Sequence, residues 1–366
     1  MAAWRGAPFP HGARRRARGL GDEDPGPHHA VVRLHSLTLL LACGLPWLPT
    51  PGSRAGLPPT ARQDSARPAA ESSWERPENP WERPEAWRVR EDLREALPPT
   101  IVVRELSSSE PPLQAWLVTA RPDEGWEVEA ALPKKGLRTT SAQAQDLGAL
   151  VAVNAGFFSG TGSVSTVVDE GVLACCGPSA VTRQGGAYPV TRAAIGFDAD
   201  GAIDCAWTWC FGDTLYAFEA PVPNAPGAPA KAPAREQGTP WRAEELVGGG
   251  PMLVSRSVLA NREVAECFQS LGGTSRHPRT AAGWTKDGTL LLLVVDGRSK
   301  ASRGATLAET GRMLLAHGAH EALNLDGGGS STLWVAGRIL NSPSDRSGER
   351  PVGSVLALVP AKRAPQ

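Results

Sequence analysis

The stretch TLLLLVVDGRSKASRGATLAETGRMLLAHGAHEALNLDGGG, Thr289 to Gly329, contains a strand, a helix and a second strand in its pattern of apolar residues. Its first part, Thr289 to Val295, is apolar on both alternating faces, which predicts a strand buried on both sides. The apolar spacing that follows predicts a helix, with Thr306 as its N-cap and Gly318 as its stop. A second predicted strand, Ala322 to Leu325, completes a strand–helix–strand unit.

Two aspartates directly follow these strands, Asp296 after the first and Asp326 after the second. A strand–helix–strand unit is expected to be parallel and right-handed, so both aspartates fall at the sheet edge where open α/β sheets bind ligands. If the strands are neighbours, their backbones lie about 4.8 Å apart and both carboxylates can reach one substrate. We therefore expect a mixed α/β (α+β) domain with a central, partly parallel sheet, flanking helices and several β-hairpins.

Three glycines, Gly327 to Gly329, follow Asp326. Their main-chain amides can form an anion-binding concavity, and the missing side chains let a ligand approach the backbone. The next residues, SSTLWVAGRIL, predict a hairpin that closes near Ala336-Gly337. Because no helix follows, a phosphate-binding P-loop or a dinucleotide-binding motif is disfavoured. A tight turn between two strands is the structural alternative.

The other elements are predicted from local patterns. TIVVRELS and LQAWLVTA alternate like strands, so folded structure is expected to start near Thr100. A helix is expected from Ser141, and hairpins are expected to turn at Asp200-Gly201 and at Asp287-Gly288. The expected domain comprises residues 100–362.

The first 99 residues have a different composition. Residues 1–43 are predicted to be an extension and an export signal, because the apolar part of Val31 to Pro49 is too short to span a bilayer. Cys43 ends a lipoprotein-like LLAC, although an ordinary signal peptidase site further on is an alternative. Residues 44–99, rich in proline and alanine, are predicted to be a disordered linker. Alternatively, the tryptophans of this linker dock on the folded domain. They are Trp74, Trp81 and Trp87.

Charge and cysteine content limit the classes of function. The chain has 38 lysines and arginines and 38 aspartates and glutamates, so its net charge does not favour nucleic acid. Export permits disulfides among its six cysteines. The spacing of cysteine and histidine does not match a zinc site. We expect no metal site and no cofactor, with a divalent cation as the alternative.

Longer motifs resemble those of the phosphodiester glycosidase family, which includes enzymes that remove N-acetylglucosamine from phosphate. The similarity extends from Val151 to Val359 and is carried by NAGFF, VGGGPMLV, HPRTAAGWTKDGTLLLLVVDGR, GATLAETGRMLLAHGAHEALNLDGGGSST, NSPSD and ER, in this order. The resemblance implies a hydrolase that separates a sugar from a phosphodiester. Its implied active-site cleft consists of Asn154, Gly156, Arg279, Asp296, Arg298, Asp326, Gly327, Gly328, Ser330 and Ser331.

Roles follow from the chemistry that the resemblance implies. Asp326 is expected to face the anomeric carbon with Asp296 as its partner, since paired carboxylates act in most glycosidases. Arg279 and Arg298 are expected to bind phosphate through bidentate hydrogen bonds. Hydroxyl groups of the sugar would be bound by Asn154, Ser330 or Ser331.

Structural alternatives exist for several of these residues. Asp296 could instead bond the GRS turn, and Arg279 could be a buried salt-bridge partner of either aspartate. Phe157 is more often a core residue than a sugar platform. His277 is given no role as a proton shuttle, since a lone loop histidine rarely has one.

The expected partner is a carbohydrate or a glycosyl phosphodiester, with no nucleic acid and with membrane contact only through a lipid anchor. The expected location is the bacterial cell envelope, in the periplasm or as a surface lipoprotein, or the medium after secretion. The expected substrate is a glycoconjugate of the envelope or of exopolysaccharide. Two other functions are alternatives. A metal-assisted phosphodiesterase would use the aspartates as ligands of a divalent cation. A non-catalytic envelope protein would bind polysaccharide without turnover.

Overall fold

The computed structural model describes residues 79–122, 125–160, 162–183, 186–260, 262–268 and 273–361. These residues fall within one of two structural units of the chain, Ala70–Gln366. The expected export signal, Cys43 and Trp74 lie outside the described residues. Among the helices of the described ranges, none is long and apolar enough to cross a membrane.

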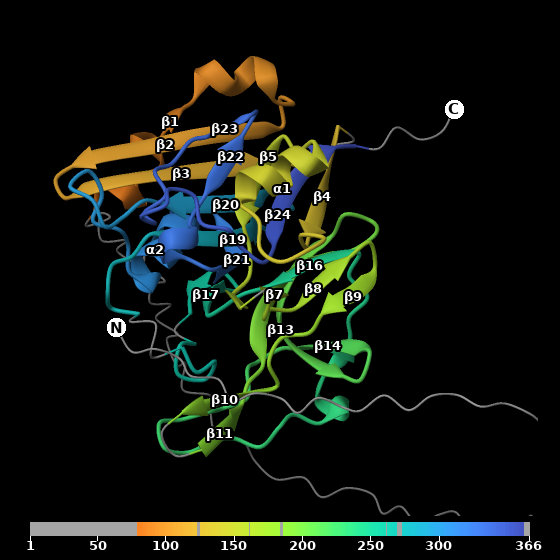
Figure 1. Cartoon of the computed structure of the whole chain (residues 1–366). Helices are drawn as coiled ribbons and strands as arrows, with labels where there is room; N and C mark the ends of the chain where they lie inside the picture. The colour runs from red at the N-terminus through yellow and green to blue at the C-terminus, as the bar shows by residue number, and fades with distance from the viewer. Residues whose placement is uncertain are drawn as a thin grey trace, which may run out of the picture. The chain divides into compact units, whose positions relative to one another are not determined.

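The largest sheet has eight strands and contains the predicted strand–helix–strand unit (Figure 1). Neighbouring strands in it pair antiparallel throughout. Across the sheet the order is β1 (Arg88–Val89), β2 (Ile101–Ser109), β3 (Pro112–Ala120), β20 (Leu290–Val295), β19 (Arg279–Thr285), β21 (Ala319–Asn324), β17 (Met252–Ser255) and β18 (Val258–Leu259).

The expected α/β class, with a helix-flanked and partly parallel sheet, is wrong. Every strand pairing among the described residues is antiparallel. The unit itself forms, and β20 and β21 run in the same direction, but β19 lies between them. The reason is that β19 and β20 form a hairpin, which leaves the other edge of β19 free to pair with β21.

The apolar strand β20 is buried on both faces, as predicted. Leu290, Leu292 and Val294 contact the core between the sheets, and the alternate residues pack in a second cluster with helix α2 (Leu307–Ala316). Thr306 caps α2 as expected: its side chain accepts from Glu309 N, and the Glu309 side chain accepts from Thr306 N. This reciprocal capping box satisfies two otherwise unpaired amides at the start of the helix.

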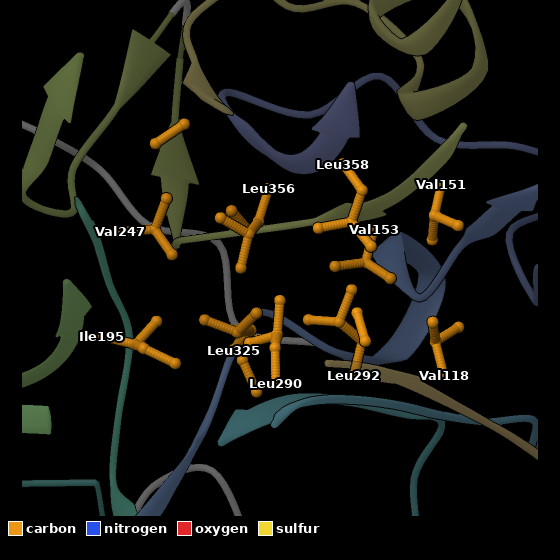
Figure 2. Packing of buried hydrophobic residues seen from close by; sticks show 14 of the residues in the cluster. Val118, Val151, Val153, Ile195, Val247, Leu290, Leu292, Leu325, Leu356 and Leu358 are labelled. Atoms are coloured by element: carbon orange, nitrogen blue, oxygen red, sulfur yellow. The ribbon is translucent and has the colours of Figure 1, made fainter. Parts of the chain in front are cut away.

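The main core lies where three sheets meet. A five-stranded and a seven-stranded sheet contribute strands to it, and Figure 2 shows two rows of apolar side chains facing each other. The labelled residues are Val247, Leu356, Leu358, Val153 and Val151 in one row and Ile195, Leu325, Leu290, Leu292 and Val118 in the other.

The five-stranded sheet has the order β23 (Arg338–Ile339), β22 (Leu333–Val335), β5 (Val151–Asn154), β24 (Val355–Pro360) and β4 (Trp126–Ala131). The seven-stranded sheet has the order β15 (Thr239–Pro240), β14 (Thr214–Phe218), β13 (Ile203–Phe211), β12 (Arg192–Phe197), β16 (Glu245–Gly248), β8 (Val167–Asp169) and β9 (Val172–Cys175).

Local predictions of turns are confirmed. The hairpin β12–β13 turns at Asp200-Gly201, β19–β20 at Asp287-Gly288, and β22–β23 at Ala336-Gly337. Helix α1 (Thr140–Leu147) packs on the five-stranded sheet. It begins one residue before the predicted Ser141, because Thr139 caps it: the Thr139 hydroxyl accepts from Ala142 N. Two further hairpins are small: β10 (Ala180–Arg183) with β11 (Gly186–Pro189), and β6 (Phe158–Ser159) with β7 (Gly162–Ser163).

Part of the stretch assigned to the linker packs against the eight-stranded sheet. Trp81 and Trp87 are buried in the cluster that includes α2, and the Trp87 indole donates to Trp81 O at 3.1 Å. Arg312 of α2 donates to Glu82 at 2.7 Å. These contacts match the docking that was the alternative for the two tryptophans. Three short 3-10 helices form here, Pro80–Glu82, Pro84–Ala86 and Glu91–Ala96.

Among the described residues, one disulfide joins the residue that follows the edge strand β9 to the inner strand β13 of the seven-stranded sheet. Cys176 pairs with Cys210, and their Cα atoms are 6.4 Å apart. Cys175, Cys205 and Cys267 are free. The bond crosslinks residues separated by 34 positions, which restricts the unfolded chain and thereby favours the folded state.

Candidate active site

A cavity of about 260 Å³ opens at the edge of the eight-stranded sheet where β20 and β21 end and β19 begins. Its walls carry one carboxylate, two guanidinium groups and one imidazole. This combination suits an anionic ligand with a reacting centre beside the carboxylate. The lining residues are Phe157, His277, Arg279, Arg298, Asn324, Asp326, Gly327 and Gly328.

Sheet topology explains why distant residues meet at this edge. Since β19 is antiparallel to both neighbours, its first residue, Arg279, lies at the same edge as the ends of β20 and β21. Asp296 and Asp326 follow those two ends. The strands β20 and β21 are separated by β19, so their backbones lie about 10 Å apart rather than one strand spacing. The three predicted catalytic residues therefore share an edge, with the arginine between the aspartates in the order of strands.

Asp326 lines the cavity and is partly buried. Burial raises the pKa of Asp326 to about 6, although hydrogen bonds from Ser330 and Gly327 N, and the charge of Arg350, act in the opposite direction. Gly327 N donates to Asp326 Oδ1 at 2.9 Å. A carboxylate with this pKa is ionised at neutral pH and still accepts a proton readily, as a general base must.

Arg279 is held rigidly at the cavity wall. Its Nε donates to Ala305 O at 2.9 Å and its Nη2 donates to Ser275 O at 3.0 Å. Burial lowers the pKa of Arg279 to about 10, which leaves it charged at neutral pH. No ion pair to Asp296 or Asp326 occurs among the described residues. The guanidinium charge is therefore not neutralised by either aspartate.

Arg298 approaches the cavity from an exposed turn after β20. Its backbone has φ of 61°, a left-handed conformation that costs a non-glycine residue roughly 1–2 kcal/mol. Its guanidinium lies against the glycine turn: a Cβ built on Gly328 would come within 2.9 Å of Arg298 Nη2. Strained residues of this kind cluster at functional sites, where the surrounding structure holds them in place.

Close packing explains why the turn after Asp326 consists of glycines. Gly328 has φ of +65°, and a Cβ on Gly329 would lie 2.4 Å from Arg350 Nη2. A main-chain hydrogen bond also holds the turn in place: Gly328 N donates to Pro278 O at 2.9 Å. A side chain at either position would strain the turn or displace an arginine, and a side chain at 328 would also press against Arg298.

The other predicted site residues lie outside the cavity lining. Asn154 is 1% exposed and holds the site together: its Nδ2 donates to Asp326 O at 2.6 Å, while its Oδ1 accepts from Thr280 and Thr332. Gly156 is required by close packing, since a Cβ there would lie 2.4 Å from Ser165 Cβ. Ser330 and Ser331 directly follow the three glycines and are buried.

Asp296 is 5% exposed and is turned away from the cavity lining toward Asn341. Its carboxylate accepts from Asn341 Nδ2 at 3.0 Å and from Ser342 N at 3.0 Å. Asn341 Nδ2 also donates to Ser331 O at 2.9 Å, which connects Asp296 to the glycine turn. Burial raises the pKa of Asp296 to about 6. This geometry favours a positioning role, and a role as partner carboxylate stays a prediction.

Replacing Asp296 by asparagine separates these two roles. The variant places an amide donor against donors of Asn341 and Ser342, so we expect a lower thermal midpoint and a loss of kcat/KM of about tenfold, from a displaced glycine turn. A direct role in the reaction predicts a much larger loss, comparable to that of Asp326→Asn. Thermal melts and kinetics of the two variants, measured side by side, decide between them.

Three lining residues were not predicted: His277, Asn324 and Phe157. Strand alternation could have found the first two, because His277 lies two residues before Arg279 and Asn324 two residues before Asp326. Burial, followed by the charges of Arg279 and Arg298, lowers the pKa of His277, so its imidazole is neutral at neutral pH. A neutral imidazole can accept or donate a proton beside a bound anion.

Two larger cavities have the wrong charge for an anion. One of about 400 Å³ has Arg256 as its basic residue beside Asp198, Asp204, Glu219 and Glu321. The other, of about 630 Å³, is lined by carboxylates without a lysine, arginine or histidine; the acidic residues are Glu127, Glu129, Glu170, Asp198, Asp200, Glu244 and Glu245. Within the described ranges, no group of three or more His, Cys, Asp or Glu side chains is arranged to hold a metal ion.

The fold and the cavity together define a sheet-rich domain whose candidate site combines two guanidinium groups with one carboxylate. Residues 218–359 match the family model described as phosphodiester glycosidase. The matched region includes Arg279, Arg298, Asp326 and the glycine turn.

Individual relatives cover limited parts of the chain. It is 36% identical over 107 residues to N-acetylglucosamine-1-phosphodiester alpha-N-acetylglucosaminidase of Bos taurus, covering 27% of this chain and 19% of the relative. The enzyme of the same name from Mus musculus is 29% identical over 221 residues, covering 58% and 37%. The prophage-derived uncharacterized protein YomE of Bacillus subtilis is 46% identical over 70 residues, covering 19% and 11%. The chain thus spans well under half the length of these relatives.

Solved structures also align. The catalytic domain of the zebrafish N-acetylglucosamine-1-phosphodiester alpha-N-acetylglucosaminidase, auto-inhibited by its pro-peptide, aligns with a TM-score of 0.49 and 20% identity, over 71% of this chain and 82% of that chain. A putative exported protein of Burkholderia pseudomallei aligns with a TM-score of 0.45 and 23% identity, over 68% and 74%.

Proposed function

We propose that this domain is a hydrolase that separates a sugar from the phosphate of a glycosyl phosphodiester. The observation that carries the proposal is the cavity that Asp326, Arg279 and Arg298 line together. The family match and the names of the relatives support the same reaction class. By analogy with the relatives' printed names, N-acetylglucosamine is the first sugar to test.

The cavity residues divide the reaction into two tasks. Arg279 and Arg298 bind the phosphodiester anion, because planar guanidinium groups match phosphate oxygens. Asp326 faces the anomeric carbon and either stabilises the oxocarbenium-like centre as a nucleophile or removes a proton from the attacking water. The C–O bond breaks, its electron pair leaves with the phosphate, and water supplies the hydroxyl of the free sugar.

A phosphate monoester needs less protonation on leaving than an alcohol does. The arginines stabilise the negative charge that develops on it, so this reaction requires less help from a second carboxylic acid. This chemistry agrees with a cavity whose described lining contains one carboxylate, that of Asp326. His277 is placed to exchange a proton with the departing phosphate or with water.

We further propose that the protein is exported and acts on glycoconjugates of the bacterial envelope or its exopolysaccharide. The disulfide between Cys176 and Cys210 supports an oxidising compartment. The predicted signal segment supports the same location.

Hydrolysis in water labelled with heavy oxygen tests the reaction. The substrate is the methyl phosphodiester of N-acetylglucosamine 1-phosphate, and the expected products are free sugar carrying the label and unlabelled methyl phosphate. Label in the phosphate would contradict the proposal, because it marks P–O cleavage by a phosphodiesterase. Binding without any product would instead support a non-catalytic carbohydrate-binding protein.

A further inference from the structure

We propose that Phe157 is the platform on which the sugar ring of the substrate rests, and that Phe268 and Arg192 hold this platform in place. The inference rests on the proposed function and adds a specificity-determining residue to it. It concerns the sugar half of the substrate, whereas the arginines concern its phosphate.

Two adjacent phenylalanines have different surroundings. Phe157 lines the cavity together with Arg279, Arg298 and Asp326. Phe158 instead packs on a separate apolar cluster that includes Val352. The backbone of Phe157 is fixed on both sides, because its N–H donates to Ser165 Oγ at 2.8 Å and its carbonyl accepts from Val164 N at 2.9 Å. The ring is therefore presented to the cavity by a rigid segment.

The ring of Phe157 is supported by a second ring. Phe268 lies 5.4 Å from it between ring centroids, at an interplanar angle of 39°, and is 4% exposed. The Arg192 guanidinium carbon is 3.7 Å from the centroid of Phe268, a close cation–π contact. The arginine, the buried ring and the cavity ring thus form a chain of contacts ending at the cavity.

A fully buried carboxylate anchors this support. Glu266, two residues before Phe268, accepts from Ala193 N at 3.1 Å, from Met252 N at 2.9 Å and from the Trp207 indole at 2.8 Å. These bonds attach the segment that contains Phe268 to the seven-stranded sheet, to β17 and to the core. Phe268 is therefore held by bonds that do not involve the cavity, and it can keep Phe157 in position when the cavity is empty or filled.

The charges of the cavity determine where each half of the substrate can lie. The phosphodiester anion belongs beside Arg279 and Arg298, and Asp326 repels it. The C–H face of a sugar ring is apolar, so Phe157 is the lining side chain best suited to cover it. The cavity of about 260 Å³ is slightly smaller than most ligand pockets, which span about 300–1,000 Å³. We infer one sugar residue on Phe157, with the alcohol on the other side of the phosphate extending outward.

The test compares Phe157→Leu, Phe157→Trp and the matched control Phe158→Leu, with the methyl phosphodiester of N-acetylglucosamine 1-phosphate as substrate and inorganic phosphate as inhibitor. Phe157→Leu should raise KM about tenfold and leave the inhibition constant of phosphate within about twofold, while Phe157→Trp keeps KM near the parent value. Phe158→Leu should lower the thermal midpoint without changing KM. Phe268→Leu, measured alongside, should raise KM by a smaller factor than Phe157→Leu.

Equal KM values for Phe157→Leu and Phe158→Leu, or an equal loss of phosphate binding, would overturn the platform. The proposal can be tested even if the parent protein shows no turnover. Binding of N-acetylglucosamine 1-phosphate and of inorganic phosphate, followed by ligand-observed NMR, should then show that Phe157→Leu weakens only the first. If Phe157→Leu changes the affinity for both ligands equally, the platform is contradicted. If the parent protein shows no hydrolysis, only the proposed reaction is contradicted.

Discussion

Asp326→Asn is expected to lower kcat on a glycosyl phosphodiester about a thousandfold, with the protein still folded. The carboxylate is the one acidic group in the described lining of the cavity, and an amide can neither act as a nucleophile nor accept a proton from water. The isosteric side chain keeps the acceptor for Gly327 N. Steady-state kinetics and circular dichroism on the same preparation measure both effects.

Asp287→Asn is the matched control for this variant. Asp287 lies in the exposed turn of the β19–β20 hairpin, at the opposite end of β19 from the cavity. The control should retain nearly full kcat. Near-normal turnover by a folded Asp326→Asn protein would remove Asp326 from the reaction.

The difference in stability between Asp326→Asn and the parent protein should depend on pH in a defined direction. Burial raises the pKa of Asp326 from 3.8 to about 6, so the folded protein binds this proton more tightly than the unfolded chain does. The stability that this proton contributes is lost as pH rises from about 4 to about 6. Asparagine has no charge to bury, so the thermal midpoint of Asp326→Asn relative to the parent should increase over this window and then level off. A difference that is independent of pH would contradict the raised pKa.

Arg298→Gly is expected to raise KM for a phosphodiester about 10- to 100-fold while making the folded protein more stable. The loss of affinity follows from removing hydrogen bonds to a charged phosphate, which contribute about 1.5–3 kcal/mol. The gain in stability follows from the backbone, because glycine adopts a φ of 61° without the strain of arginine. The greater freedom of glycine in the unfolded chain offsets part of this gain, so we expect roughly 0.5–1 kcal/mol.

Arg256→Gly is the control for Arg298→Gly. Arg256 is also an exposed arginine with positive φ, 53°, in the turn after β17, but it does not line the cavity. Its replacement should stabilise the protein without changing KM. Chemical denaturation and inhibition by inorganic phosphate separate the two effects. An unchanged KM for Arg298→Gly would show that the guanidinium does not bind the substrate.

Local sequence determined the elements of this protein. The apolar run of β20, the Thr306–Glu309 capping box and the Asp-Gly turns each contain the chemistry that fixes their own conformation, so their positions could be predicted. The family motifs also identified Asp326, Arg279 and Arg298, which the structure brings to one cavity. These predictions required no knowledge of which strands are neighbours.

The pairing of strands and the direction of the site side chains could not be predicted from local sequence, because both depend on distant parts of the chain. β21 pairs with the edge of β19 that β20 leaves free. The strand–helix–strand unit that was expected to form parallel pairs is therefore part of an antiparallel sheet. Asp296 shares the edge with Asp326, but Asn341 and Ser342, about 45 residues away, turn its carboxylate from the cavity. Phe157 and Phe158 are indistinguishable by residue type, and only the tertiary packing shows that Phe157 lines the cavity while Phe158 packs on an apolar cluster. Sequence supplied the chemistry, while packing selected which groups can meet a substrate.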